Sequence, residues 1–406
     1  MFYNIYIIKN MSYYLLPKNP FLIHKYIDYI ECDTPPTAAI SNSLSTYLSE
    51  IKQKIDYREK DWDIFKKYTN PYEYVHSTVP YKKLSVAKAK PLSRSFFKMI
   101  EILQTFQLAT SSQPINTFHL AEGPGGFIEA ISALRKNKSD IYIGMTLIDE
   151  YNDPNIPGWK KTNTFLKQNP NVYIERGLDG TGNILSVKNL LGCKDAYKSS
   201  IDFITADGGF DFSFDFNSQE VSIAQLLFAQ VCYAVTMQKK GGTFVLKVFD
   251  CFMQHTMDIL CILTSFYDKV YITKPNTSRY ANSEKYIVCK NFLLPTCEKF
   301  FPFIQKAFEK MIAPPGLVNN MYVHRFLNIP LPLCFVSKLE EYNAILGQQQ
   351  IENIHYTILL IDNKHNQDKV DILIKMNIQK CMQWCVKHEL PYNIITTNPN
   401  VFLQMS

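Results

Sequence analysis

Short apolar runs alternate with helical stretches through residues 93–292, and this alternation limits the possible folds more than any other feature of the chain. The runs are rich in β-branched and aromatic residues, as strands are: 116–121, 140–146, 171–175, 201–206, 243–248, 269–273 and 285–289. Helical periodicity is found between them at 126–136, 220–239 and 253–266. Strands that alternate with helices predict a mostly parallel sheet covered on both faces, which is an α/β fold.

The chain divides into three regions around this pattern. Residues 1–85 are rich in aromatic residues and are expected to form a mainly helical N-terminal extension, whereas residues 86–295 hold the α/β pattern. Residues 296–406 begin with several prolines and contain a helical pattern at 368–388, so we expect a mainly helical C-terminal extension that packs on the rest. With 46% apolar and 20% charged residues, the 406-residue chain can bury a core of this size.

Positive charge is concentrated between residues 51 and 100. Lysine and arginine outnumber acids there by enough to account for the whole net charge of +6. Such a block is typical of a protein with a polyanionic partner, although a solvated helical face would look the same. The ten cysteines show no paired spacing, so we expect reduced thiols and no metal site. No apolar run approaches the roughly 20 residues that span a bilayer, so no membrane partner is expected.

A glycine-rich turn follows the first predicted strand and precedes a helix. Small residues in such a turn let the backbone approach a ligand, and the helix N-terminus attracts negative or polar groups. No Gly-Lys-Ser/Thr follows and no GxGxxG pattern is present, so a phosphate loop and a dinucleotide fingerprint are both disfavoured. A simple tight turn remains the alternative. The segment reads Glu122-Gly123-Pro124-Gly125-Gly126-Phe127.

Four charged residues stand where a core is expected: Lys98, Asp207, Lys247 and Glu284. Lys247 interrupts an apolar run that reads as a buried central strand, where an unpaired lysine costs several kcal/mol. Each of the four alone is compatible with an ordinary ion pair. Together, two lysines and two acids predict one cluster at the edge of the sheet. There the flanking carboxylates orient Lys247 so that it acts as a general base near neutral pH.

These residues and their surroundings resemble the FtsJ-type RNA 2′-O-methyltransferases, whose active site is a Lys-Asp-Lys-Glu tetrad. The matching motifs are SRSFFKMIEI, ITADGGF, GGTFVLKVFD and KPNTSRYANSEKYIV. Within that family the chain is most similar to the cap-specific mRNA branch, on residues 144–147, 206–210 and 274–289. The resemblance covers about half the chain. It implies a Rossmann-like class I methyltransferase sheet with helices on both faces, flanked by the two mainly helical extensions.

The resemblance also implies an activity. The chain would bind S-adenosyl-L-methionine and transfer its methyl group to the ribose 2′-hydroxyl of a 5′-terminal nucleotide of capped mRNA. Lys247 would take the hydroxyl proton, Asp207 and Glu284 would fix Lys247, and Lys98 would position the ribose. No metal is required. A 2′-O-methyltransferase of ribosomal or other internal RNA, and a non-catalytic RNA-binding subunit of a capping apparatus, remain alternatives. Whether the first or second transcribed nucleotide is modified stays open.

Two sets of binding residues follow from the same resemblance. Two departures bear on the first set: His119 stands where many relatives carry an acid, and the loop after the third strand lacks the usual Gly-Asp, so the adenine contact moves to Asp179 or Asn183. The expected cofactor-binding residues are Glu122, Gly123, Pro124, Gly125, Gly126, Phe127, Asp149, Asp179, Asn183 and Asp207. The expected RNA-binding residues are Arg94, Lys98, Lys274, Ser278 and Arg279. Tyr72, Tyr74 and Tyr81 either stack on a base or belong to the core.

Capped mRNA is therefore the expected partner, together with a capping-apparatus or polymerase protein. Richness in Lys, Asn, Ile and Tyr suggests an AT-rich genome, such as that of a large cytoplasmic DNA virus. No strong basic nuclear-import cluster and no secretory signal are evident. We therefore expect the chain in the cytoplasm, including a viral factory or a virion, and leave the nucleus open.

Overall fold

A sheet of eight strands forms the centre of the computed structural model, which describes residues 12–148, 158–159, 162–209, 218–313 and 321–395. In the sheet the order is β1-β8-β9-β7-β6-β3-β4-β5. The strands are β1 (Tyr13–Leu15), β3 (Asn116–Leu120), β4 (Ile141–Met145), β5 (Val172–Glu175), β6 (Ile201–Ala206), β7 (Gln238–Val248), β8 (Tyr267–Thr273) and β9 (Lys285–Phe292). The α/β fold expected from the alternating pattern is confirmed.

The order of the strands determines where a ligand can bind. Strands β3 to β7 are parallel, while β9 is antiparallel to both β7 and β8. The chain enters the parallel part of the sheet at β3, moves outward through β4 to β5, and returns to place β6 on the other side of β3. The connection that leaves β3 therefore leads toward one edge of the sheet, and the connection that leaves β6 leads toward the other. In open α/β sheets such a switch point, at the carboxyl ends of the strands, is where ligands bind.

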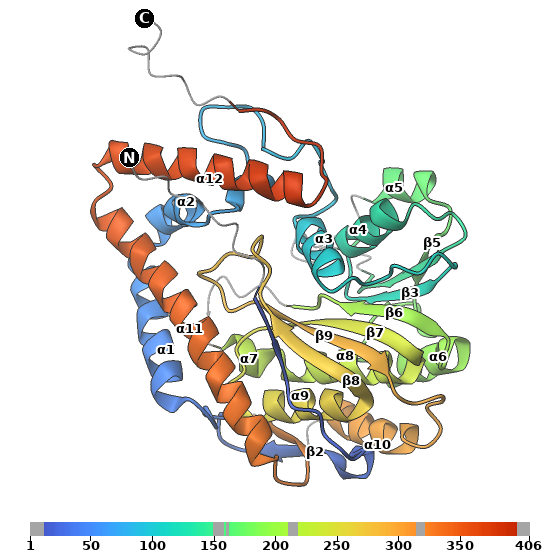
Figure 1. Cartoon of the computed structure of the whole chain (residues 1–406). Coiled ribbons are helices and arrows are strands. Elements are labelled where there is room, and N and C mark those ends of the chain that lie inside the picture. The colour runs from blue at the N-terminus through green and yellow to red at the C-terminus, as the bar shows by residue number, and fades with distance from the viewer. Residues whose placement is uncertain (1–11, 149–157, 160–161, 210–217, 314–320, 396–406) are drawn as a thin grey trace, which may run out of the picture.

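Helices cover both faces of the sheet (Figure 1). One face carries α3 (Ser95–Thr105), α4 (Gly126–Arg135) and α5 (Asn163–Gln168). The other carries α6 (Val187–Tyr197), α8 (Ala224–Met237), α9 (Gln254–Phe266) and α10 (Phe301–Ile312). Helices α4 and α9 lie within a few residues of the predicted ranges 126–136 and 253–266, whereas the sequence pattern does not predict α3, α5, α6 and α10.

One predicted helix differs from the structure. The pattern at 220–239 indicates a single helix, whereas the chain forms a short α7 (Gln219–Ser222) and then α8, which ends at Met237. Gln238 already has extended dihedral angles and pairs with Ile201 in the sheet. Its side-chain amide donates to the carbonyl of Ile201 over 2.9 Å. Residues 238 and 239, which were expected to end the helix, therefore belong to β7.

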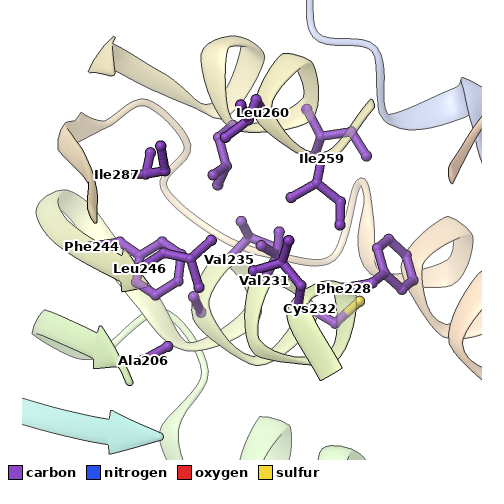
Figure 2. Packing of buried hydrophobic residues seen from close by; sticks show 14 of the residues in the cluster. Ala206, Phe228, Val231, Cys232, Val235, Phe244, Leu246, Ile259, Leu260 and Ile287 are labelled. Atoms are coloured by element: carbon purple, nitrogen blue, oxygen red, sulfur yellow. The ribbon is translucent and has the colours of Figure 1, made fainter. Parts of the chain in front are cut away.

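Alternation along β7 separates the core from the functional face. Phe244, Leu246 and Val248 are buried against one set of helices, and Figure 2 shows the first two packed next to Val231 and Val235 of α8. Val245 belongs to the hydrophobic cluster on the opposite face. Because side chains alternate along a strand, the side chain of Lys247 emerges on that second face.

The two extensions pack together beside the sheet. Helices α1 (Asn42–Asp56) and α2 (Glu59–Thr69) lie against α11 (Leu333–Asp362), and α12 (Gln367–Lys387) packs on α2 (Figure 1). Most regular structure in the extensions is helical, as predicted. The N-terminal extension also supplies strands that the sequence pattern does not reveal: β1 extends the edge of the central sheet, and β2 (Ile27–Cys32) pairs with β10 (Tyr322–Leu327). Short 3-10 helices occur at His24–Tyr26 and Glu73–Val75.

All ten cysteines lie among the described residues, and each has a free thiol. Cys381 and Cys385 of α12 and His388, directly after that helix, are all buried. Within the described part of the chain, no set of three or more His, Cys, Asp or Glu residues is arranged to hold a metal ion. In the same part, no helix combines the length and the apolar character that crossing a bilayer requires.

Phe228 provides a test of the core. It is 1% exposed, and its ring stacks on Phe326 of β10 with 4.1 Å between centroids. We expect Phe228→Ala to lower the free energy of unfolding by about 3–5 kcal/mol, because it leaves a cavity between α8 and β10. Phe21→Ala, at a side chain that is 76% exposed, should change it by no more than about 0.5 kcal/mol. Guanidinium unfolding measures both, and equal effects would contradict this description of the core.

Candidate active site

A cavity of about 680 Å³ opens at the carboxyl ends of β3, β4, β6 and β7, at the switch point of the sheet. Charged and polar side chains from sequence-distant segments line it together with an apolar wall. The lining residues are Ser93, Arg94, Ser95, Lys98, Ala121, Glu122, Gly123, Pro124, Thr146, Leu147, Gly182, Asn183, Ile184, Leu185, Asp207, Gly209, Leu226 and Lys247.

Lys247 and Asp207 form the first ion pair of the site. The Lys247 Nζ lies 3.2 Å from Asp207 Oδ1 and donates to the Asp207 carbonyl oxygen over 2.7 Å. Tyr286, which faces Lys247 across the β7–β9 ladder, donates its hydroxyl to the same Asp207 Oδ1 over 3.2 Å. Gly209 leaves room for the amine, because a Cβ at that position would lie 3.3 Å from Nζ. Asp207, at the end of β6, thus holds the Lys247 amine at the cavity wall, and Tyr286 of β9 in turn holds Asp207.

Lys98 and Glu284 form the second ion pair. The Lys98 Nζ lies 2.7 Å from Glu284 Oε1, and both residues are buried. Ser278 donates its hydroxyl to the same oxygen over 2.7 Å. Burial raises the pKa of Glu284, but the charges of Lys98 and Lys247 outweigh it and leave that pKa well below its usual range. Burial lowers the pKa of Lys98, and the nearby Glu284 charge opposes this effect.

The four residues that the sequence singles out therefore come together. Glu284 is acted on by the charges of both lysines, and Lys98 by those of Glu284 and Asp207. Three of the four line the cavity, whereas Glu284 is absent from the lining and is paired with Lys98. A pair of amines balanced by a pair of carboxylates keeps the cluster electrically neutral in a place where solvent is scarce.

The glycine-rich turn has two different parts. Gly123 and Pro124 line the cavity, next to Glu122. Gly125 has a φ of +107°, which favours glycine, and a Cβ on Gly126 would lie 2.2 Å from the hydroxyl oxygens of Ser93 and Ser95. These two glycines and the fully buried Phe127 are absent from the cavity lining. The structure gives these three residues a packing role, and their contact with a cofactor stays a prediction.

Glu122 occupies the N-terminus of α4. Its Oε1 accepts from the backbone N–H groups of Phe127 and Ile128, over 2.6 and 3.2 Å. Burial and the nearby charge of Asp207 raise the pKa of Glu122 well above its usual range. The helix terminus is thus satisfied by the chain's own carboxyl group. A ligand in the cavity meets the Glu122 side chain there.

The loop after β5 contains the two residues that are alternatives for the adenine contact, Asp179 and Asn183. Asp179 accepts hydrogen bonds from Thr181, Ser186 and Asn189, which hold its pKa below the usual range although burial opposes them. That carboxylate is absent from the cavity lining, whereas Asn183 belongs to it. The adenine contact expected at one or the other therefore fits Asn183 better. The remaining candidate, Asp149, lies outside the described residues.

The predicted RNA-binding residues have separate positions. Arg94 lines the cavity and donates to the Thr277 carbonyl over 3.2 Å. Lys274 is buried, with its ammonium bonded to the backbone oxygens of Asn282 and Glu284 and to the Asn282 side chain. Ser278 is fully buried and serves Glu284. Lys274 and Ser278 are thus enclosed and bonded to the segment that begins β9, and their contact with RNA stays a prediction.

Arg279 lies at a smaller cavity beside the first. Its guanidinium is held by Glu73 of the N-terminal extension, with Nε to Oε2 at 3.0 Å and Nη2 to Oε1 at 2.7 Å. This second cavity has a volume of about 230 Å³. Its lining comes mainly from the extensions and from the segments next to the tetrad: Lys52, Ile55, Trp62, Lys66, Gln219, Phe249, Arg279, Ala281, Asn282, Ser283 and Gln350.

Other sequence candidates belong to the core. His119 is fully buried between the hydroxyls of Thr205 and Thr117, 2.7 and 2.8 Å away, and burial lowers its pKa to about 3. Tyr72 and Tyr74 are buried as well, so their core interpretation holds.

Sequence reasoning missed much of the apolar wall of the cavity. Thr146 and Leu147 directly follow β4. Ile184 and Leu185 lie just before α6, and Leu226 lies in α8. Only the position of Thr146 and Leu147 at the end of a predicted strand could have signalled their role. The other three carry no chemical signal in the sequence.

Comparisons with known proteins agree with this geometry. Residues 91–292 match the FtsJ-like methyltransferase family. This part of the chain is an FtsJ-like methyltransferase domain.

Three curated relatives illustrate the similarity. The chain is 28% identical over 338 residues to "Cap-specific mRNA (nucleoside-2'-O-)-methyltransferase 2" of Danio rerio, covering 81% of this chain and 44% of that protein. It is 29% identical over 275 residues to "Cap-specific mRNA (nucleoside-2'-O-)-methyltransferase 1" of Trypanosoma brucei brucei, covering 64% and 69%. It is 29% identical over 298 residues to "Probable methyltransferase EP424R" of African swine fever virus, covering 70% and 66%. The chain spans about half the length of the first of these relatives.

The Lys98–Glu284 pair predicts a pH-dependent loss of stability. Glu284→Gln leaves the buried Lys98 ammonium without its counter-charge, so the free energy of unfolding near pH 7 should fall by about 3–5 kcal/mol. The depressed pKa of Glu284 means that the wild type loses this contribution as pH falls below about 4.3, the pKa of an unfolded glutamate. The difference between wild type and variant should therefore narrow at acidic pH.

A matched control is the exposed Lys338–Glu341 pair on α11. Glu341→Gln should change stability by less than about 1 kcal/mol at any of these pH values. Urea unfolding between pH 3 and pH 8 measures both variants. A Glu284→Gln effect as small as that of the control would refute the buried pair.

Proposed function

We propose that the chain is an S-adenosylmethionine-dependent RNA methyltransferase that modifies the ribose 2′-hydroxyl of a 5′-terminal nucleotide of capped mRNA, with Lys247 as the general base. The observation that carries the proposal is the Lys247 amine at the cavity wall, 3.2 Å from Asp207 and balanced by a second Lys–Glu pair. Membership of residues 91–292 in the FtsJ-like methyltransferase family supports the same reaction.

The 680 Å³ cavity suits the cofactor, since small-molecule sites usually measure about 300–1,000 Å³. Leu147, Ile184 and Leu185 offer an apolar surface for the adenine, and Asn183 offers polar groups at its edge. Glu122 and Asp207 supply acidic side chains on the side of the glycine turn. S-adenosylmethionine supplies an electrophilic methyl group on a sulfonium, so the protein needs no covalent intermediate.

The chain's own residues then handle one proton. Lys247 Nζ, in its neutral amine form, accepts the proton of the 2′-hydroxyl, which makes the ribose oxygen a stronger nucleophile toward the methyl group. The ammonium formed in this way is paired with Asp207 Oδ1 and passes the proton to solvent after the transfer. Asp207 and Tyr286 keep the amine in a fixed position, and Lys98 stands beside it to orient the ribose and stabilise negative charge on the oxygen. Fixed positions of these groups reduce the reorganisation that the reaction requires.

The second cavity favours a capped 5′ end over internal RNA as substrate. It combines two aromatic side chains, Trp62 and Phe249, with the cations Lys66 and Arg279. Stacking surfaces and positive charge together suit a base that carries phosphates. Trp62 and Lys66 belong to the N-terminal extension, outside the FtsJ-like domain. Internal RNA and a non-catalytic role remain the competing functions.

Lys247→Met tests the proposed base. Removing the amine should lower the rate of methyl transfer by at least about 100-fold, because positioned general bases contribute about that much or more. The Kd for S-adenosylmethionine should stay within about twofold of the wild-type value, since the cofactor contacts other residues. Lys269→Met, at an exposed lysine on β8, is the matched control and should keep full activity. Transfer of label from radiolabelled S-adenosylmethionine to RNA measures the rate.

The same assay separates the three functions. Label on capped RNA alone, lost in Lys247→Met, supports the proposal. Equal labelling of uncapped RNA indicates an internal substrate, and no labelling of any RNA despite tight RNA binding indicates a non-catalytic subunit.

Lys66→Met tests the second cavity. Loss of one cation there should raise the KM for capped RNA by about 10-fold, the size expected for a charge-assisted contact to phosphate. The KM for S-adenosylmethionine should not change. The adjacent Lys67 is exposed and absent from the lining, so Lys67→Met should leave both constants at their wild-type values. Equal KM values for both variants would exclude the cavity from RNA binding.

A further inference from the structure

Helix α1 of the N-terminal extension buries a lysine next to the tetrad. Lys52 is 6% exposed, although its helix otherwise buries apolar residues. Its Nζ lies 2.9 Å from Asp250 Oδ2, and Lys285 Nζ lies 3.4 Å from the other oxygen of the same carboxylate. Lys52, Asp250 and Lys285 form a buried triad, which we call the lysine clamp. A buried charge is costly unless it is paired, so a lysine carried into this place by a separate region of the chain needs a physical reason.

The lysine clamp joins the two segments that carry the tetrad. Asp250 follows β7 three residues after Lys247, and Lys285 directly follows Glu284 at the start of β9. The Lys285 Nζ also donates to the carbonyl oxygens of Phe249 and Ser283, over 3.1 Å each. One ammonium therefore ties the end of β7 to the residue that precedes Glu284.

Charge explains why Lys52 matters to this arrangement. Burial raises the pKa of Asp250, but the charges of Lys52 and Lys285 lower it to about 2, so the carboxylate stays ionised. Lys52 has the shorter contact with that carboxylate. Without Lys52, Asp250 attracts Lys285 alone, which draws its ammonium away from the two carbonyl oxygens. The other acid nearby, Glu220, accepts from the backbone N–H groups of Phe252 and Met253.

The extensions hold the same loop at further points. The carbonyl of Phe252 accepts from the N–H of Ala39 over 2.8 Å, and Asn343 of α11 donates to the carbonyl of Cys251 over 2.8 Å. Residues 249–253 are thus fixed from outside the FtsJ-like domain. Among these contacts, that of Lys52 is connected through Asp250 and Lys285 to Ser283, the residue before Glu284.

We infer that Lys52 is a positioning residue for methyl transfer, acting through the lysine clamp to fix Glu284 and Phe249 relative to Lys247. The inference rests on the proposed function for its effect on the reaction. It assigns a role in the active site to a helix that lies outside the family's domain. Lys52 touches none of the tetrad side chains itself, so it is not a catalytic residue.

The test compares Lys52→Met with Lys54→Met, a change at an exposed lysine of the same helix. Lys52→Met should lower kcat on RNA by about 10-fold while the KM for S-adenosylmethionine stays within about twofold. In the free protein, hydrogen exchange of the backbone amides in peptides spanning 283–287 should become about 10-fold faster. Because no RNA is present, this second measurement excludes a direct loss of RNA contact. Lys54→Met should change neither quantity.

The outcomes separate this inference from the proposed function. If the wild type methylates RNA and Lys52→Met keeps both kcat and exchange within twofold of it, the inference is overturned. If the wild type methylates no RNA, the proposed function fails, but the exchange measurement still tests the lysine clamp. Faster exchange in Lys52→Met than in the wild type supports the clamp, and unchanged exchange overturns it. If Lys52→Met does not fold, Lys52→Gln keeps a hydrogen-bond donor for Asp250. It should give a loss in kcat of about threefold, and no loss would overturn the inference.

Discussion

The need to pair every buried charge determines how the active end of this sheet is built. A lysine at position 247 points from a central strand into a place with little solvent, where an ammonium ion is stable only beside an anion. Asp207 supplies that anion, and its own position depends on Tyr286 across the ladder. A second lysine, at position 98, brings a second carboxylate with it. Each charge therefore requires a partner from another strand or helix, and the fold has to bring these segments together before any reaction is possible.

The same rule extends beyond the tetrad and explains why the extensions pack where they do. Lys52 of α1 shares Asp250 with Lys285, and Glu73 of the N-terminal extension holds Arg279. Part of the basic block between residues 51 and 100 is thus internal to the protein. Lys52 and Lys98 are buried in pairs, whereas Lys66 faces the second cavity. Neither a uniform polyanion-binding surface nor a uniform solvated face describes this block.

Much of the fold follows from the sequence because strand and helix periodicities are local signals. The strands from β3 to β9 and helices α4 and α9 agree with the pattern, and so does the convergence of Lys98, Asp207, Lys247 and Glu284. The errors arise where distant contacts decide. Gln238 pairs with Ile201 and so leaves the helix, and β1 is too short to show a period of its own. The sequence also does not show that Gly126 is packed against Ser93 and Ser95, which leave no space for a Cβ at that position.

Lys274 and Ser278 show that a motif can contain residues that support the site from behind as well as residues that line it. Both lie in the stretch that resembles the family, but a buried ammonium whose three donors all meet oxygens of Asn282 and Glu284 has none left for a ligand. The geometry of Glu284 therefore depends on neighbours that never reach the cavity. A sequence motif records every residue that the site requires, and it does not distinguish those that touch the substrate from those that keep the others in place. Only burial and hydrogen-bond partners make that distinction, which is why Arg94 retains its predicted place at the cavity and Lys274 does not.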